Sequence, residues 1–258
     1  MHKFRTQLLA TTGMLALSGV AYAAELPVKA PPVAPVAPVI NWTGFYVGAQ
    51  IGGASFDPSC HTTHSSGVFS TAFPCDGEGT TSSISSAGVI GGGKIGYDWQ
   101  WNKVVLGAVG EFDWTDLNGT SRLQQFGSPT VGTASEDVHW LASARGRVGW
   151  AFDNVLFYAT GGVAWARIKE SASVTNSTDG NNWASPEVST TKTGAVAGGG
   201  FEYRVTPNVS VVGELLWYGF GQSSVSVNCP TCAVGGTYTT QFNNQDIVAG
   251  TLGVNWRF

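Results

Sequence analysis

The sequence predicts an all-β fold: an eight-stranded antiparallel up-and-down β-barrel that crosses a membrane. Three observations lead to this prediction. Only 12% of the 258 residues are charged, about half the share found in soluble domains. Apolar and polar residues alternate along eight segments, which is typical of strands with one apolar face. Long polar connections alternate strictly with very short ones, as in transmembrane barrels with four long extracellular loops and three short periplasmic turns.

Two segments precede the expected barrel. Residues 1–23 combine basic residues, an apolar stretch and a small-residue cleavage motif that ends at Ala23. This pattern is typical of a secretory signal peptide. Residues 24–41 form a Pro-, Ala- and Val-rich periplasmic linker, a composition that favours extended chain outside a sheet. The barrel domain is therefore expected at residues 42–258.

Each expected strand is long enough to cross a bilayer at a tilt. The approximate ranges are 43–53, 86–101, 104–116, 138–152, 155–167, 193–205, 209–220 and 246–258. Within 138–152 the alternation places Val138 on the lipid side and His139 in the lumen. Short turns at 102–103, 153–154 and 206–208 join strands at the periplasmic end.

Aromatic residues gather near both ends of the apolar strand faces. Tryptophan prefers the lipid–water interface, because one end of its ring is apolar and the other is wet. We therefore expect two aromatic girdles, marked by Trp99, Trp101, Trp114, Trp140, Trp150, Trp165, Trp217 and Trp256. In the alternative, a soluble barrel of lipocalin type, the aromatic residues would collect in a core instead.

The opposite strand faces carry five basic and five acidic residues. The interior of an eight-stranded barrel is just wide enough for side chains to fill, and unpaired buried charge is very costly. We therefore predict a lumen ion-pair network that closes the barrel. Its expected members are Lys94, Asp98, Glu111, Asp113, Arg145, Arg147, Glu202, Arg204, Glu214 and Arg257. Glycines on the same faces keep open the alternative of a narrow water-filled pore, and they stand at positions 44, 48, 52, 88, 92 and 96.

Four cysteines fall in expected extracellular loops, Cys60 and Cys75 in the first and Cys229 and Cys232 in the last. In an oxidising compartment we expect loop disulfides. Pairing within each loop is the first expectation, and cross-links between the two loops remain open. A metal site around Cys60 lacks an evident fourth ligand, so no metal is predicted.

No arrangement of residues indicates an enzyme or a cofactor. The glycine-rich run at 88–94 matches part of a phosphate-binding loop, but it lacks the Ser or Thr and the strand-to-helix context. The pair Cys229 and Cys232 lies in a polar loop rather than at a helix start, which favours a disulfide over a redox centre. The net charge of −4 and the lack of a basic cluster argue against nucleic-acid binding.

Three motifs carry a family resemblance: WTGFYVG at 42–48, GKIGYDW at 93–99 and VNWRF at 254–258. With the signal peptide and the Pro-Val-Ala repeats, they resemble the porin-like outer-membrane proteins of alphaproteobacteria, the RopB-type group of the OmpA-like superfamily. The resemblance covers essentially the whole mature chain. It implies insertion by the β-barrel assembly machinery, with Phe258 as the terminal aromatic of the assembly signal.

These observations predict a non-enzymatic, integral outer-membrane protein of a Gram-negative cell envelope. Its expected role is structural, with surface-exposed loops. Two alternatives remain: a porin for small hydrophilic solutes, and an adhesin or receptor that acts through its loops. The expected partners are outer-membrane lipid, lipopolysaccharide and the assembly machinery, and the loops could meet an extracellular ligand or a host surface.

Overall fold

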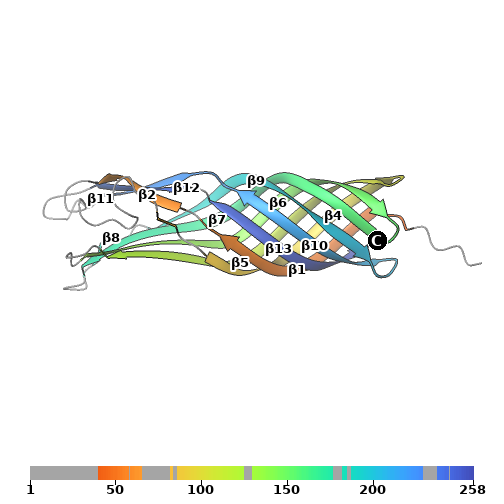
Figure 1. Cartoon of the computed structure of the whole chain (residues 1–258), viewed down its shortest axis with the longest axis horizontal. Helices are drawn as coiled ribbons and strands as arrows, with labels where there is room; N and C mark the ends of the chain where they lie inside the picture. Colours follow the sequence, from red (N-terminus) through yellow and green to blue (C-terminus); the bar gives the residue numbers. More distant parts are fainter. Residues whose placement is uncertain are drawn as a thin grey trace, which may run out of the picture. The chain divides into compact units, whose positions relative to one another are not determined.

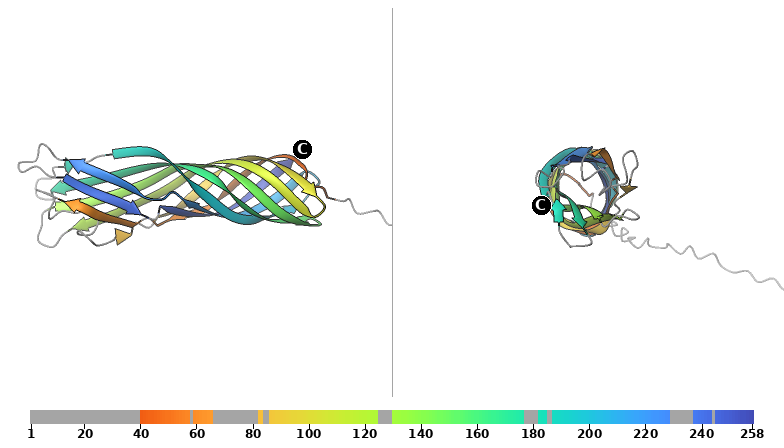
Figure 2. Two further views of the ribbon diagram at one scale, coloured as in Figure 1. Left: turned by 90° about the horizontal axis from the view of Figure 1, so that it is seen from above. Right: turned by 90° about the vertical axis from the view of Figure 1, so that its left-hand side faces the viewer.

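Eight long antiparallel strands close into a barrel (Figures 1 and 2). The computed structural model describes residues 40–57, 59–65, 82–83, 86–124, 130–176, 182–184, 187–228, 237–243 and 245–258, so the expected signal peptide and almost all of the linker lie outside the described residues. The barrel strands are β1 (Gly44–Phe56), β4 (Ser86–Trp101), β5 (Val104–Gln124), β6 (Thr130–Phe152), β7 (Val155–Asn176), β9 (Glu187–Arg204), β10 (Val209–Gly219) and β13 (Asp246–Arg257).

Every barrel strand pairs with two others. The sheet runs β6-β5-β4-β1-β13-β10-β9-β7, and a further pairing between β6 and β7 closes it. The first and last strands of the domain therefore lie side by side, with Tyr46 opposite Arg257. Among the residues that the structure describes, no helix is long and apolar enough to cross a membrane.

Three short turns lie at one end of the barrel, which we call the turn end. Asn102 and Asp153 each begin a two-residue turn with positive φ, 55° and 46°, and Asn and Asp tolerate this conformation in tight hairpins. The last strand also ends here, since the Arg257 N–H donates to the Asn208 carbonyl at 2.8 Å. Because short turns of such barrels face the periplasm, we assign the turn end to that side and call the opposite end the loop end.

Four strands run well beyond the limits that the sequence predicts at the loop end. They are β5, β6, β7 and β9, and only residues 125–129 separate β5 from β6. The expectation of a long loop at that place is therefore wrong. These polar stretches are rich in Thr, Ser and Val, which suit strands, and continued pairing satisfies their backbone N–H and C=O groups.

The other long connections also contain strands. Four of these additional strands form a second sheet in the order β11-β12-β2-β3. The fifth, β8, pairs with β7. Their bounds are β2 (Ser59–Ser65), β3 (Ser82–Ser83), β8 (Asn182–Ala184), β11 (Ser223–Asn228) and β12 (Thr237–Asn243).

Two register shifts lie near the loop end, and the one on β6 changes which of its residues face inward. The register shifts between Trp114 and Leu117 on β5, and between Val138 and Trp140 on β6. Val138 is consequently buried inside and His139 is exposed outside, the reverse of what the alternation predicts. An extra residue in one strand inverts the face of every residue beyond it.

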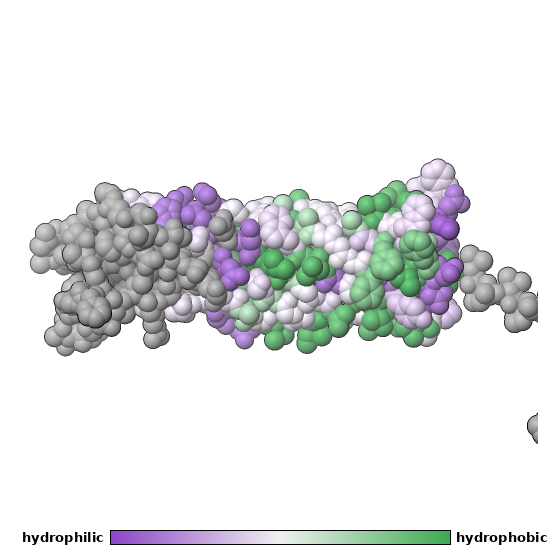
Figure 3. All heavy atoms as spheres, viewed as in Figure 1, coloured by the Kyte–Doolittle hydropathy of each residue, from purple (hydrophilic) through white to green (hydrophobic). Residues whose placement is uncertain are grey.

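The outer surface of the barrel is a belt of large apolar side chains. Ile51, Val89, Ile95, Leu215 and Leu252 are among those that point outward. Figure 3 shows this hydrophobic belt with hydrophilic residues at both of its ends. Monomers in water rarely expose apolar patches above a few hundred Å², so this surface fits the hydrocarbon interior of a bilayer.

Candidate functional site: the lumen of the barrel

All ten charged residues expected in the lumen point into the barrel. None of them is more than 7% exposed. They come from six different strands, so the barrel rather than local sequence brings them together. The members are Lys94, Asp98, Glu111, Asp113, Arg145, Arg147, Glu202, Arg204, Glu214 and Arg257.

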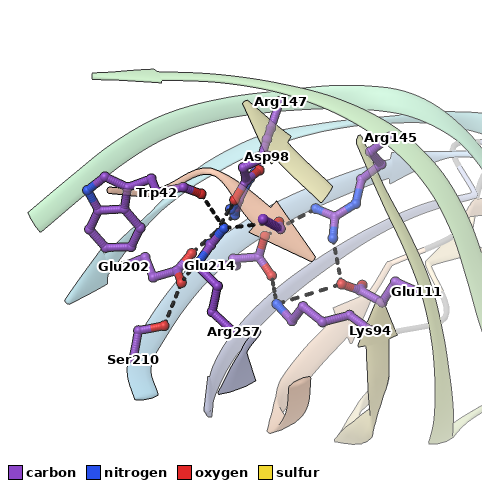
Figure 4. Close-up of polar contacts among 11 residues, drawn as sticks. Trp42, Lys94, Asp98, Glu111, Arg145, Arg147, Glu202, Ser210, Glu214 and Arg257 are labelled. Carbon is purple, nitrogen blue, oxygen red and sulfur yellow. Dashed lines mark hydrogen bonds and ion pairs between the residues drawn. The ribbon is translucent and has the colours of Figure 1, made fainter. Parts of the chain in front are cut away.

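Four of these residues form a turn-end quartet, Asp98, Arg147, Glu202 and Arg257 (Figure 4). Arg147 Nε donates to Asp98 Oδ1 at 2.6 Å, and Arg147 Nη1 lies 3.3 Å from Glu202 Oε2. Arg257 Nη2 contacts the same two carboxylates at 2.8 and 3.5 Å. Ser210 Oγ adds a hydrogen bond to Glu202 at 2.5 Å. The two positive and two negative charges cancel, so no net charge is buried.

A second, middle quartet lies nearer the loop end and is also neutral. Arg145 bridges Glu111 at 2.5 Å and Glu214 at 3.4 Å. Lys94 Nζ pairs with Glu214 and lies 3.9 Å from Glu111. The hydroxyl of Tyr218 donates to Glu111 at 3.4 Å. Figure 4 shows these side chains crossing the lumen from strands on different sides.

Aromatic rings cover the guanidinium groups of the turn-end quartet. The Cζ atom of Arg147 lies 4.7 Å from the ring centre of Tyr46 and 4.9 Å from that of Tyr158. Arg257 lies 5.0 Å from the Tyr46 ring. Cation–π contacts of this kind strengthen when both partners are desolvated, so the rings help to hold the charges in place.

Two of the ten residues stand outside the quartets. Asp113 accepts hydrogen bonds from Gln50 Nε2 at 3.0 and 3.2 Å. Arg204 donates to the Pro207 carbonyl at 2.8 Å and lies over the Trp42 ring. Within the described parts of the chain, neither of them forms an ion pair. The expected network of ten residues is therefore divided into two quartets, with Asp113 and Arg204 outside them.

An inner apolar layer lies in the loop-end half of the lumen, and it is not among the sites expected from the sequence. Its residues are inward-facing and packed against one another across the barrel. The irregularity on β6 turns Val138 into it, so strict alternation could not place this residue there, whereas the other members follow the alternation of their strands. The members of this layer are Ala54, Phe56, Ile90, Leu117, Val138, Leu141, Ala164, Ala166, Ile168, Val196, Leu216, Tyr218, Phe220, Ile247 and Ala249.

Beyond the outer aromatic residues lies a buried polar cluster of Glu136, Glu170, Lys192, Ser223 and Gln245. Lys192 pairs with Glu170 and donates to Ser223 at 2.9 Å and to Gln245 at 2.6 Å. Gln245 Nε2 donates to Glu136 at 2.6 Å. Burial, and then the nearby Glu170 carboxylate, raise the pKa of Glu136 to about 8. This shift favours the protonated form of Glu136 beside the Lys192–Glu170 ion pair.

Several of the inward glycines are tightly packed against neighbouring residues. A Cβ atom on Gly48 would overlap the Asn255 amide, and one on Gly96 would overlap the ring of Tyr46. A Cβ atom on Gly92 would meet the Asp113 carboxylate and the neighbouring backbone. The glycines thus admit large neighbouring side chains, which fill the narrow interior.

We expect Gly96→Ala to destabilise the barrel by about 1–3 kcal/mol, the usual range for overpacking. The new methyl group would strike the buried Tyr46 ring, which is also in contact with the Arg147 guanidinium. Urea unfolding in lipid vesicles measures the change. Gly110→Ala is the control, because its Cβ atom would meet only the Ile95 methyl group at 4.0 Å. Equal losses for both variants would contradict the close packing at Gly96.

The eight girdle tryptophans all lie on the outward-facing side of the barrel. Six are exposed, and Trp140 and Trp165 are half-buried. Trp114 is paired with Trp140 across β5 and β6. Phe112 stacks on Trp140 with 5.7 Å between ring centres. The exposed six are Trp99, Trp101, Trp114, Trp150, Trp217 and Trp256.

Most of the expected disulfide residues lie outside the described residues: Cys75, Cys229 and Cys232. Cys60 lies on β2. In the described part of the chain, no group of three or more His, Cys, Asp or Glu residues could hold a metal ion. Phe258 is 74% exposed, and its N–H donates to the Phe45 carbonyl at 3.0 Å.

Comparison with known families fits this architecture. The model of the outer membrane protein beta-barrel domain matches residues 14–258. The chain belongs to this family. It is an integral protein of the outer membrane and lies in the lipid of that membrane.

Named relatives of this outer-membrane barrel come from alphaproteobacteria. The 31 kDa outer-membrane immunogenic protein of Brucella melitensis is 29% identical over 80% of this chain and 83% of its own length. The 22 kDa outer membrane protein of Rhizobium leguminosarum is 27% identical over 69% of this chain and 64% of its own length. The crystal structure of OprG from Pseudomonas aeruginosa is 13% identical, covers 85% of this chain and 99% of that chain, and has a TM-score of 0.48.

Proposed function

We propose that this protein is a non-enzymatic, structural barrel of the outer membrane with a closed lumen. The observation that carries the proposal is the filling of the lumen by two neutral quartets and the inner apolar layer. In this proposal the charged residues stabilise the barrel from inside, because eight of the ten form ion pairs with one another rather than contacts with solvent or substrate.

The two kinds of filling would block ions in different ways. A permeating ion must break buried pairs in a quartet, and removing one partner of such a pair costs several kcal/mol. It must then cross the inner apolar layer, where hydrophobic constrictions stop ions by excluding water. The quartets and the inner apolar layer are successive barriers along the lumen. If one barrier is lost, the other still blocks the passage of ions.

The proposal also covers cleavage of the signal peptide and insertion of the barrel into the membrane. We propose that the chain is cleaved after Ala23 and that residues 24–41 remain as a periplasmic linker. The outward row of Val254, Trp256 and Phe258 on the last strand supports recognition by the β-barrel assembly machinery. Contact of the outer aromatic girdle with lipopolysaccharide belongs to the same proposal.

A second candidate function is adhesion or ligand binding at the loop end. The observation that favours it is the extension of β5, β6 and β7 beyond Trp114, Trp140 and Trp165, together with the second four-stranded sheet. Relatives named immunogenic proteins suggest that this end is reached from outside the cell. Binding of intact cells that express loop-deleted variants tests it, and unchanged binding to every tested surface would reject it.

Conductance in a planar lipid bilayer tests the closed lumen. We expect no steady single-channel current from the wild-type protein, because both quartets and the inner apolar layer lie across the path. Arg145→Ala, which opens only the middle quartet, should also stay silent. A steady wild-type current that Arg145→Ala alters would place an open path through the lumen and overturn the proposal.

A further inference from the structure

The mouth of the barrel at the turn end is closed by a short strap, Ile40–Thr43. Trp42 at its centre is 0% exposed and packs on Leu156, Val212 and other inward-facing apolar residues, with Ile40 against the same cluster. The Trp42 N–H donates to Gln100 Oε1 at 2.7 Å. Its carbonyl accepts a hydrogen bond from Arg257 Nη1. The strap is therefore bound at both backbone groups of its central residue.

Arg204 beneath the strap has no acidic partner in the described structure. It is only 6% exposed, and its Nε and Nη2 atoms have no hydrogen-bond partner there. The nearby turn-end quartet is neutral, so Arg204 adds one uncompensated positive charge at the mouth. Burying an unpaired ion is costly, and such a group requires an explanation.

The Trp42 ring covers the face of the Arg204 guanidinium, and no counter-ion lies at its edge in the described structure. The Cζ atom of Arg204 lies 4.3 Å from the ring centre, and that of Arg257 lies 5.6 Å from it. The π face of an indole attracts a cation, but it leaves the N–H donors of the guanidinium edge unused. Nε and Nη2 lie on one edge of the guanidinium, and this edge matches two oxygens of a carboxylate or phosphate.

We propose that Arg204 and Arg257 form a binding site for a small oxyanion, carboxylate or phosphate, and that the strap Ile40–Thr43 covers this site through Trp42 and shuts it off from solvent. With the strap in place the site is closed. With the strap withdrawn, the site opens toward the periplasm and accepts the anion. Because the site lies at the turn end of the lumen, beside the turn-end quartet and outside the middle quartet and the inner apolar layer, this inference does not depend on whether the lumen conducts.

Thermal unfolding of the full barrel with inorganic phosphate as the probe tests the site. Ionic strength is held constant with sodium chloride, and a heat-dependent gel shift verifies folding. We expect Trp42→Ala to unfold at a temperature that rises by about 3–5 °C as phosphate increases to saturation, since a ligand that binds only the folded state stabilises it. The wild-type protein and Trp101→Ala, which removes an outward tryptophan at the same end, should show no phosphate dependence.

Arg204→Met in the Trp42→Ala background distinguishes a specific site from general salt effects. The phosphate-dependent rise should disappear in this double variant. The same rise in the double variant, or its absence in folded Trp42→Ala, would overturn the proposal. If Trp42→Ala does not fold, Trp42→Leu carries the same comparison, because it removes the π face while keeping apolar volume in the mouth.

Discussion

Replacing Arg147 with methionine should destabilise the barrel by about 3–5 kcal/mol, the cost of removing one partner from a buried ion pair. Arg147 contacts both Asp98 and Glu202. Without it, these two carboxylates share Arg257 alone, and the quartet carries a net negative charge in a site closed to water. Methionine fills much of the volume that the arginine side chain leaves. The loss of unfolding free energy therefore comes mainly from the missing charge and not from a cavity.

Urea unfolding of the protein in lipid vesicles, followed by tryptophan fluorescence, measures this loss. Arg167→Met is the matched control, because Arg167 is exposed on the outer face and forms no ion pair among the described residues. The control should change stability by less than about 1 kcal/mol, as is usual for exposed charges. The double variant Asp98→Asn with Arg147→Met should lose less than the sum of its single variants, because both act on one network. Additive losses would contradict the quartet.

Leu141→Ala is expected to cost about 2–5 kcal/mol, the range for truncating a large buried aliphatic side chain. Leu141 is 1% exposed and belongs to the inner apolar layer. Its truncation removes packing contacts and leaves a cavity in a rigid barrel wall that cannot collapse to fill it. The same unfolding experiment measures the change.

Leu215→Ala provides the comparison for the lipid face. Leu215 is 63% exposed on the outside of the barrel, where fluid lipid chains refill the space that truncation leaves. We expect a clearly smaller loss than for Leu141→Ala. Equal losses for the two variants would mean that the inner layer is no better packed than the lipid contact, and this would weaken the case for a second seal.

Local sequence patterns were sufficient to predict the strands of this barrel, their inward and outward faces, and the short turns between them. Alternation with period two follows from strand geometry itself, so it assigned the inward faces of Lys94, Arg145 and Glu214 without knowledge of their partners. Pairs such as Asn102-Lys103 and Asp153-Asn154 marked the tight turns, because few residues accept their backbone conformation. The outward tryptophans followed from the same alternation.

Alternation failed where the strands depart from regular geometry. The irregularity near Val138 leaves no clear signature in a single sequence, and it inverts the face of the residues beyond it on β6. This is why alternation predicts that His139 faces the lumen and Val138 the lipid, the reverse of their positions in the barrel. The continuation of the polar connections as strands was also hidden, because Ser- and Thr-rich segments suit both loops and exposed strands.

The sequence by itself determined that this chain is a membrane barrel with a charged interior. Only the tertiary structure decided that eight of the ten charged residues form two separate quartets, and that Arg204 lies over the Trp42 ring without an acidic partner in the described structure. The physical reason is that period and turn chemistry are properties of neighbouring residues. Which charges meet across the lumen depends on the relative stagger of the strands when the barrel closes, and that stagger is set by all eight strands together.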